Sequence, residues 1–287
     1  MTRRAISYRV LSYIWHEPSN RSQRFRRILR ASWWQVRKRL TKRPARIRLS
    51  NGRIFIADPA DEMASFAVYA HTYHSELVTF VERVVDEGAM VDVGANVGLF
   101  ALLLSHRFRE AVLYEASPEA VRKAEANILL NRLENYCVKG KAVCDHVGTV
   151  RFSAPKPTGL TNRITDDDDG VTMPATTLDR DLDPDFRRRL SFLKIDVEGA
   201  ELKVLAGARE TLALSPHLLV LFERLKRAPL GALLRFFEEQ DYAVFAIADG
   251  MPTKSTEMIS RAHDLFACRA AHFDVLCLRA REGRARG

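Results

Sequence analysis

The sequence predicts an α/β protein with a doubly wound, mostly parallel sheet and a basic helical N-terminal arm. Three observations lead to this prediction. Residues 91–104 read as a strand, a glycine-rich turn and a helix. Apolar segments downstream alternate between strand-like and helix-like patterns, which is typical of βαβ units. Positive charge is concentrated before residue 49, which separates an arm from the sheet.

Charge divides the chain into an arm and a body. The 287 residues are 47% apolar and 28% charged, an ordinary composition for one large domain or two small ones. Residues 1–48 contain fifteen Lys or Arg and one acidic residue, Glu17, whereas the rest is mildly acidic and the whole chain carries +9. We predict a basic amphipathic arm over 1–48, a main domain over 49–281 with a lead-in hairpin and helix over 49–75, and a disordered tail over 282–287.

The arm reads as two helices interrupted near Pro18–Asn20. In the second helix, apolar residues recur at three- and four-residue steps between arginines and lysines. These apolar positions are Phe25, Ile28, Leu29, Trp33, Val36 and Leu40. Three interpretations are open: the helix packs on the body, it contacts an anionic membrane surface, or it contacts nucleic acid, which is the least expected partner.

Cysteine usage and hydropathy favour a cytoplasmic protein. The four cysteines show no C-x-x-C spacing and lie in apolar, strand-like surroundings, which favours reduced, buried thiols over disulfides or metal ligands. No window provides the roughly eighteen apolar residues of a membrane span. Arg9 interrupts the first apolar segment, which also lacks a signal-peptide cleavage site. The expected location is the cytoplasm, with peripheral contact at the inner face of the membrane if the arm binds lipid.

Between the arm and the glycine-rich turn, the pattern predicts a hairpin and two helices. Apolar residues alternate on both sides of Asn51-Gly52, a dipeptide typical of a two-residue turn. Two helical patterns then lead to the glycine-rich strand. His71 and His74 lie between these helices, where they either face a cofactor or serve as surface or capping residues.

The glycine-rich turn has the composition of a nucleotide-cofactor site. Gly94, Asn96 and Gly98 follow the strand 91–93 at two-residue intervals, and an apolar helical run begins at Leu99. Small residues, or residues that tolerate a left-handed backbone, allow a sharp turn, and the new helix points free N–H groups at a ligand. The G-x-G-x-x-G template of dinucleotide sites fails, because Asn96 and Leu99 occupy its second and third glycine positions.

A carboxylate follows the second strand of the predicted sheet. The apolar segment 111–114 ends at Glu115, seventeen residues after Gly98. An acidic residue at about this place hydrogen-bonds the ribose of a bound nucleotide. Ser117-Pro118 then opens the next helix as an N-cap and a first-turn proline.

Carboxylates also follow two later strands. A buried strand over 192–195 ends at Asp196, and the strand 218–222 ends at Glu223. Neighbouring parallel strands end at one edge of a sheet, and open α/β sheets bind their ligands at that edge. We therefore expect these two side chains to lie close together.

The other segments complete the predicted sheet. Glu198 and Glu201 suit the first turn of a helix because of its dipole. The loop 153–172 holds an acidic run that fails the calcium-loop template, so we predict a solvated turn that forms part of a substrate lid. The remaining predictions are strands over 136–143, 149–152 and 243–247, a helix over 230–240, and a last strand over 272–278.

Taken together, these stretches resemble the FkbM-type S-adenosylmethionine (SAM)-dependent methyltransferases of class I. The likeness is collinear from about residue 49 to 278 and excludes the arm. The residues that carry it are Val91-Asp-Val-Gly-Ala-Asn-Val-Gly98, Tyr114-Glu-Ala-Ser-Pro118, Asn127, Asn131, Ala142-Val-Cys-Asp145, Gly148, Thr177-Leu-Asp179, Phe192-Leu-Lys-Ile-Asp-Val-Glu-Gly-Ala-Glu201, Val204-Leu-Ala-Gly207 and Glu223.

The resemblance implies a Rossmann-like sheet of seven strands whose last strand is antiparallel. It also implies SAM as the cofactor and methyl transfer to a hydroxyl of a sugar, glycan or other secondary metabolite. By position, the cofactor would be bound by Asp92, Gly94, Ala95, Asn96 and Gly98 on its methionine side, Glu115 at its ribose and Ala142 near its adenine. The loops expected to form the acceptor pocket, 153–172 and 224–229, are where such families differ.

Methyl transfer from an activated sulfonium requires an aligned acceptor and a route for its proton. Our hypothesis is that Asp196 and Glu223 orient the acceptor hydroxyl and that one of them is the base. Alternatively, they hold cofactor or backbone groups, or jointly bind a divalent ion, although we predict no metal site.

Other classes of function are also open. An NAD-dependent oxidoreductase shares the strand, turn and ribose carboxylate but needs the glycine template that fails here. An RNA methyltransferase would explain the basic arm, yet an Asn/Asp-Pro-Pro-Tyr-like segment is missing after the fourth strand. A SAM-binding interaction module without catalysis is the third alternative. The oligomeric state is not predicted.

Overall fold

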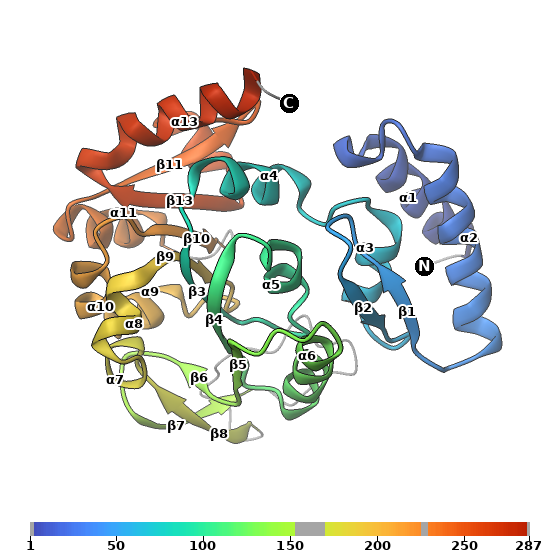
Figure 1. Cartoon of the computed structure of the whole chain (residues 1–287), viewed down its shortest axis with the longest axis horizontal. Coiled ribbons are helices and arrows are strands. Elements are labelled where there is room, and N and C mark those ends of the chain that lie inside the picture. Colours follow the sequence, from blue (N-terminus) through green and yellow to red (C-terminus); the bar gives the residue numbers. More distant parts are fainter. Residues whose placement is uncertain (1–2, 153–169, 225–228, 286–287) are drawn as a thin grey trace.

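A central sheet of eight strands organises the computed structural model, which describes residues 3–152, 170–224 and 229–285. The strands are β3 (Gly88–Val93), β4 (Phe108–Tyr114), β5 (Tyr136–Lys139), β9 (Leu190–Ile195), β10 (Leu219–Glu223), β11 (Tyr242–Ala248), β12 (Met251–Thr253) and β13 (Asp264–Arg269). Their order across the sheet is β12-β11-β13-β10-β9-β3-β4-β5 (Figure 1). Parallel pairing joins β5, β4, β3, β9 and β10, so the carboxyl ends of these strands share one edge.

The last strand of the sheet, β13, lies antiparallel between β10 and β11. This confirms a mostly parallel α/β sheet whose last strand is antiparallel. The predicted number of strands was seven, and the eighth is the three-residue β12, which pairs only with β11. Such a short strand after an Asp249-Gly250 turn has too little sequence pattern to be recognised.

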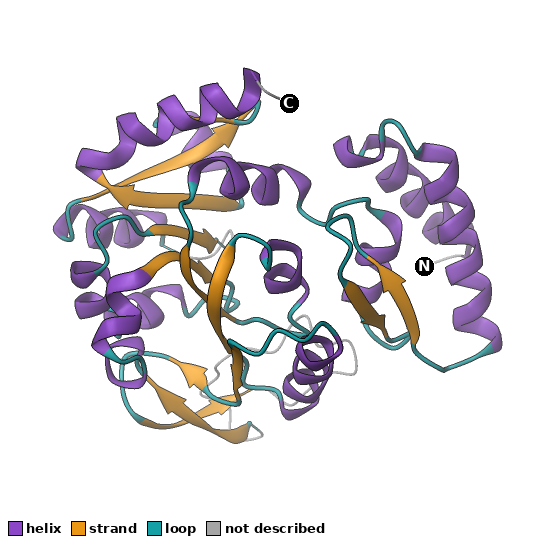
Figure 2. Ribbon diagram, viewed as in Figure 1, coloured by secondary structure: helices purple, strands orange, loops and turns teal. Residues whose placement is uncertain are grey.

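Alternating side chains give the sheet two buried faces, both covered by helices (Figure 2). On one face, the apolar core includes residues of α4 (Ser75–Val84), α5 (Leu99–Leu104), α6 (Pro118–Leu130) and α13 (Phe273–Ala285). The other face packs on α7 (Leu178–Asp181), α8 (Pro184–Arg189), α9 (Glu201–Ala206), α10 (Arg209–Leu214), α11 (Leu230–Glu239) and α12 (Thr256–Arg261).

The predicted third strand over 136–143 is in fact two strands in different sheets. It breaks at Gly140, after which β6 (Ala142–Val143) joins a three-stranded sheet with β7 (Gly148–Phe152) and β8 (Val171–Thr176). The predicted strand over 149–152 is present as β7. The acidic run 166–169, and with it most of the predicted lid, lies outside the described residues.

The arm contains α1 (Arg3–His16), the short 3-10 helix Pro18–Asn20 and α2 (Arg24–Leu40), with the predicted interruption in place. Figure 1 shows both helices beside α3 (Glu62–Tyr69) and the hairpin of β1 (Ala45–Arg48) and β2 (Ile54–Ala57). Two asparagines of α6 and its C-terminal end, both among the residues that resemble the FkbM family, bond to this hairpin. Asn127 accepts from the Ile56 N–H, and Asn131 accepts from the Ile54 N–H, each at 2.8 Å.

The C-terminal segment corrects two predictions. Residues 272–278 are not a strand, because α13 begins at Phe273 after the 3-10 helix Ala270–His272. Leu276 and Ala280 are buried at a spacing of four residues, which is helical packing. The helix continues to Ala285, so most of the tail predicted to be disordered over 282–287 is helical. The strand next to β10 is instead β13, at Asp264–Arg269.

The structure shows the exposure of the cysteines and the character of the helices. All four cysteines are free thiols, but Cys137 is exposed, against the expectation of burial, while Cys144 and Cys268 are buried. Within 3–152, 170–224 and 229–285, every helix is too short or too polar to cross a membrane.

Candidate cofactor and acceptor site

A cavity of about 410 Å³ opens at the carboxyl ends of β3, β4, β9 and β10. Seven of the nine predicted site residues line it: Gly94, Ala95, Asn96, Glu115, Ala142, Asp196 and Glu223. Asp92 and Gly98 do not. Asp92 lies fully buried beneath the cavity, and Gly98 is the N-cap of α5. The topology therefore brings the glycine-rich turn after β3 and both proposed catalytic carboxylates to one cavity.

The glycine-rich turn has a left-handed backbone at Gly94, Asn96 and Gly98, with φ values of 77°, 50° and 74°. Glycine is required at position 94 because a Cβ there would lie 1.8 Å from the main-chain oxygen of Asp196. The sequence suggested that this glycine lets a ligand approach, but the closest approach is by the end of the neighbouring strand. Asn96 suits its position because asparagine tolerates the left-handed region better than most residues.

Glu115 is held at the cavity wall by the backbone. One carboxylate oxygen accepts from the Asn96 N–H and the other from the Ser117 N–H, each at 2.8 Å. Burial raises the pKa of Glu115, against the lowering effect of these hydrogen bonds. Each oxygen keeps a second lone pair, so the carboxylate can still accept from a ligand hydroxyl.

Lys194 connects two carboxylates of the site, those of Asp92 and Asp196. Lys194 is paired in register with Asp92 on the neighbouring strand, so both side chains lie on the same face of the sheet. Its Nζ lies 3.4 Å from Asp92 Oδ1 and 3.0 Å from Asp196 Oδ2. Burial favours the neutral amine, but the two carboxylates raise the pKa of Lys194 above its ordinary value. Burial raises the pKa of Asp92.

Asp196 and Glu223 hold different protonation states. Burial would raise the pKa of Asp196, but the Lys194 charge and a hydrogen bond from Glu223 lower it to about 2. Burial, together with this hydrogen bond and the negative charge of Asp196, raises the pKa of Glu223 to about 9. At neutral pH, Asp196 is therefore an anion and Glu223 a neutral hydrogen-bond donor.

Two residues at the start of β13 complete this end of the cavity. Asp264 is the antiparallel partner of Glu223, and His263 Nε2 lies 3.0 Å from Glu223 Oε1. Both line the cavity, as Lys194 does. None of the three was predicted to function in the site. Lys194 could have been predicted, because residues two apart in a strand lie on the same face and Lys194 precedes Asp196 by two. His263 and Asp264 could not, because the last strand was predicted in the wrong place.

The segment between α3 and α4 forms another wall of the cavity. His74 and Tyr73 line it, and His74 has a left-handed backbone with φ of 48°. Burial lowers the pKa of His74, although the Asp264 charge acts in the opposite direction. His71 lies apart from the cavity lining, and its Nδ1 is 2.6 Å from the Arg27 guanidinium. Of the two candidate histidines, only His74 faces the cavity.

Glu198 and Glu201 do not open a helix together, as predicted. Glu198 has a left-handed backbone and lines the cavity, while α9 begins only at Glu201. Glu201 is buried, and its carboxylate accepts from the Gly199 N–H at 2.8 Å. This carboxylate therefore closes the turn after Asp196.

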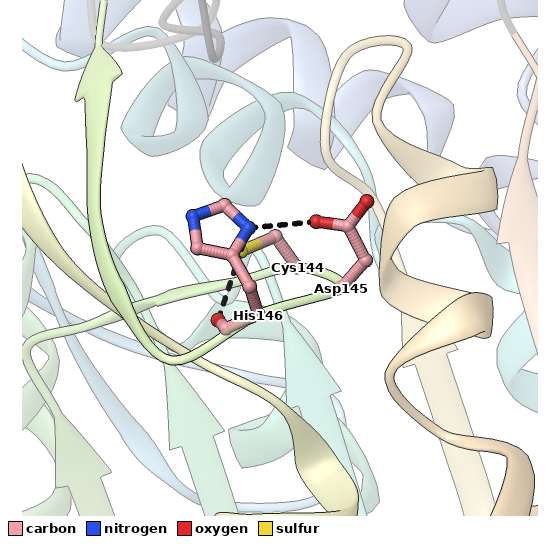
Figure 3. A group of neighbouring side chains, drawn as sticks. All are labelled: Cys144, Asp145 and His146. Atoms are coloured by element: carbon pink, nitrogen blue, oxygen red, sulfur yellow. Dashed lines mark hydrogen bonds and ion pairs between the residues drawn. The ribbon is translucent and has the colours of Figure 1, made fainter.

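Cys144, Asp145 and His146 form a small cluster after β6 (Figure 3). Their three potential ligand atoms lie within 4.8 Å of one another. His146 Nδ1 is 2.8 Å from Asp145 Oδ1, and the Cys144 thiol donates to the His146 carbonyl at 3.3 Å. Burial raises the pKa of Cys144, which opposes the thiolate that a metal site needs. We interpret the cluster as a set of hydrogen bonds that stabilises the turn after Ala142 and Val143.

The groups that line the cavity would suit a nucleoside with a positively charged tail. Glu115 offers an acceptor for a ribose diol, apolar residues including Ala142 and Val143 offer a slot for a base, and Asp196 supplies negative charge. Both lysines of the lining are already paired with carboxylates, Lys194 with Asp196 and Lys141 with Asp181. The fold and the position of the cavity are those of α/β proteins that bind a ligand at the carboxyl edge of a parallel sheet.

The family follows from comparison with known sequences. The chain matches the model of the methyltransferase FkbM domain over residues 92–244, which is more than half of its length. The chain therefore belongs to the FkbM methyltransferase domain family. No curated protein matches it.

Solved structures with similar folds include several methyltransferases. The methyltransferase FkbM of Methylobacillus flagellatus KT is 18% identical, with a TM-score of 0.43 over 63% of this chain and 43% of that one. The precorrin-6y C5,15-methyltransferase of Geobacter metallireducens GS-15 is 16% identical, with a TM-score of 0.41 over 68% and 86%. The putative transferase PH0793 of Pyrococcus horikoshii is 13% identical, with a TM-score of 0.42 over 80% and 73%. The chain spans less than half of the FkbM structure.

Proposed function

We propose that this protein is a SAM-dependent O-methyltransferase that modifies a hydroxyl of a sugar, glycan or other secondary metabolite. The observation that carries the proposal is the Asp196–Glu223 carboxylate pair, which faces the same cavity as the cofactor turn. Membership of the FkbM methyltransferase domain family supports the reaction class.

The residues that would hold SAM are those of the turn and the adjoining strand ends. Glu115 would accept from the ribose hydroxyls, Ala142 would contact the adenine, and the backbone of Gly94–Asn96 would border the methionine part. Bound SAM supplies a methyl group that is already activated by its positively charged sulfur. The chain itself must therefore position the acceptor and remove a proton.

Asp196 is the residue best suited to receive that proton. Its ionised carboxylate can accept a hydrogen bond from an acceptor hydroxyl, which fixes the direction of the oxygen lone pair. The hydroxyl becomes far more acidic as the new carbon–oxygen bond forms, so even a weak base can take its proton. The sulfur–methyl bond would break as the carbon–oxygen bond forms, so that the methyl group would end on the acceptor oxygen and S-adenosylhomocysteine would be the leaving group. The proton would pass to Asp196 and then to solvent.

Glu223 and Lys194 have positioning roles in this scheme. Protonated Glu223 donates to Asp196, and Lys194, whose Nζ lies 3.0 Å from Asp196 Oδ2, keeps Asp196 ionised. These two contacts fix the carboxylate against rotation. The loop 224–229, which we expect to contact the acceptor, lies mostly outside the described residues. The contacts among Lys194, Asp196 and Glu223 lie at the carboxyl ends of β9 and β10.

Methyl-labelled SAM tests the proposal when it is incubated with the protein and with fractions of a cell extract. The expected product is labelled glycan or small molecule, and the label should survive mild alkali because an ether resists hydrolysis. Asp196→Asn should lower incorporation by about a hundredfold or more. The matched control is Asp185→Asn, at an exposed carboxylate on α8.

Three results would contradict the proposal. Label found in RNA would identify a nucleic-acid methyltransferase. SAM binding without transfer to any fraction would identify a cofactor-binding module. Full incorporation by both Asp196→Asn and Glu223→Gln at saturating SAM would remove the catalytic role of the carboxylate pair.

A further inference from the structure

Helix α2 has two apolar faces, and only one is packed. Ala31 and Trp34 are buried, and the Trp34 indole N–H donates to Ser65 of α3 at 3.2 Å. Phe25, Leu29 and Leu40 are exposed by 78%, 71% and 78%. At about 100° per residue, these exposed positions lie opposite the buried pair.

The exposed face is a continuous stripe along the helix. It comprises Phe25, Leu29, Trp33, Val36 and Leu40, which follow one another at steps of four, four, three and four residues. We call these residues the α2 stripe. The arm holds seven of the thirteen exposed large apolar side chains in the described part of the chain. Such a concentration marks an interaction surface rather than the scattered apolar residues of an ordinary surface.

The packed face anchors α2 to the body, so the stripe is presented by a fixed helix. The buried Asn20 side chain accepts from the His71 N–H at 2.8 Å and donates to the Tyr69 carbonyl at 3.0 Å. Arg27 donates to the Ala70 carbonyl at 3.2 Å. These contacts hold the arm against the segment that leads to Tyr73 and His74 in the cavity wall.

Cations surround the stripe without acidic partners. Arg26 and Arg39 of α2 are exposed, and so are Lys42, Arg43 and Arg46 just beyond it. Among the side chains that the structure describes, at residues 10–152, 170–224 and 229–284, the cations of the arm form no ion pair with a carboxylate.

The acidic residue of the arm is turned away from this surface. Glu17 accepts from the hydroxyl of Ser75 at 2.7 Å and from that of Ser19 at 3.0 Å. Because the described side chains pair none of the cations around the stripe with a carboxylate, the surface is complementary to an anionic partner. A second copy of the same positively charged surface would be repelled.

We propose that the α2 stripe and its flanking cations bind the protein to an anionic lipid bilayer. The helix lies in the plane of the interface, with Phe25, Leu29 and Trp33 among the acyl chains and Arg26 and Arg39 at the headgroups. Apolar side chains on a basic helix suit this partner, because a nucleic acid offers phosphate charge but no hydrocarbon in which to bury the stripe.

Vesicle sedimentation tests the proposal with the full-length protein. Wild type should sediment with vesicles of phosphatidylcholine and phosphatidylglycerol but only weakly with phosphatidylcholine alone. Raising salt from about 100 to about 500 mM should weaken binding, because the screening length shortens. Leu29→Gln with Trp33→Gln should lower vesicle affinity at least tenfold. Arg26→Gln with Arg39→Gln should lower it by about fivefold per charge.

Matched controls separate the surface from general effects of charge and hydropathy. Leu129→Gln removes a side chain that is 80% exposed on α6, and Arg122→Gln with Arg281→Gln removes exposed cations of α6 and α13. These variants should bind vesicles as wild type does. All variants should keep the wild-type thermal midpoint, because the replaced side chains are exposed.

Several outcomes would overturn the proposal. One is wild-type binding that does not distinguish anionic from neutral vesicles, and another is unchanged binding by the stripe variant. Single-stranded RNA that binds more tightly than the anionic vesicles would assign the arm to nucleic acid. A wild-type dimer that the stripe variant converts to a monomer, without vesicle binding by either, would assign the stripe to a second copy. Vesicle binding needs no acceptor, so failure here is distinct from failure of methyl transfer.

Discussion

Asp196 and Glu223 share one hydrogen bond but differ in charge at neutral pH. The difference arises from their positions, because Lys194 contacts Asp196 while Glu223 faces Asp196 and Asp264. A carboxyl that stays protonated at neutral pH acts as a donor rather than as a base. The sequence predicted the pair but not which member carries the proton, since that depends on Lys194 and on β13.

The pH dependence of methyl transfer should report the proton on Glu223. Its pKa is raised to about 9, so the donor is present below that pH and is lost above it. Activity of the wild type should therefore fall as pH rises through about 9. Glu223→Gln should keep activity at pH 7 within about threefold, because a carboxamide also donates, and should remove this alkaline decline. Initial rates from pH 6 to about 10 provide the measurement.

An opposite profile would reverse the assignment. If wild-type activity rises through about pH 9 and Glu223→Gln is inactive throughout, then the Glu223 carboxylate is the base. Glu125→Gln, at an exposed carboxylate on α6, serves as the control for effects of charge alone.

At the scale of elements, the cofactor turn is fixed by contact between two strand ends. The left-handed Gly94 packs against the main-chain oxygen of Asp196, and the Asp196 N–H donates to the Val93 carbonyl at 2.9 Å. The turn after β3 and the carboxylate after β9 therefore form one unit.

Gly94→Ala should destabilise the protein far more than Gly52→Ala. Both glycines have a left-handed backbone, with φ of 77° and 87°, so both substitutions cost about 1 kcal/mol of backbone strain. Only Gly94 is crowded, since a Cβ at Gly52 meets nothing within 4 Å. We expect a total loss of about 3 kcal/mol or more at Gly94. Urea unfolding would measure both losses, and equal losses would contradict the contact described here.

Elements whose pattern extended over several residues were predicted well. Strands β3, β4, β9 and β10 were all recognised from apolar runs that end at an acidic or glycine-rich position. The same runs identified the carboxylates directly after β4 and β9 and the one that ends β10. The last strand shows the limit of such patterns, because it was predicted over residues 272–278 and the structure places it at β13. Both segments are short and apolar, and a short apolar run does not distinguish a strand from a buried helix. Only antiparallel pairing with β10 settles the choice, and that pairing is non-local.

At the scale of the whole molecule, the basic segment of the sequence contains helices α1 and α2, and α2 packs on α3. Predicting a basic amphipathic helix required only its periodicity. Predicting that the helix has a packed face and a free face required knowledge of where α3 lies. The loop over 153–169 and the segment 225–228 lie outside the described residues, so the acceptor prediction for these loops remains a prediction.

SAM should raise the thermal midpoint of the whole protein, and NAD should not. At a SAM concentration of 100 times Kd, binding to the folded state adds about 2.7 kcal/mol. For a chain of this size, that corresponds to a rise of roughly 5 °C or more. Glu115→Gln should weaken SAM binding by about tenfold or more, because it removes a charged acceptor. Scanning fluorimetry measures the shifts, and equal protection by NAD would assign the site to a dinucleotide.

The contact between Gly94 and the Asp196 carbonyl also bears on how this family could acquire new acceptors. It joins the glycine-rich turn and the proposed proton acceptor through main-chain contact, apart from the loops that we expect to form the acceptor pocket. Loop sequence can then change freely while the reaction geometry stays constant. For protein engineering, the same sheet edge could then be kept in variants with different loops. Exchanging the loops alone should transfer specificity for the acceptor.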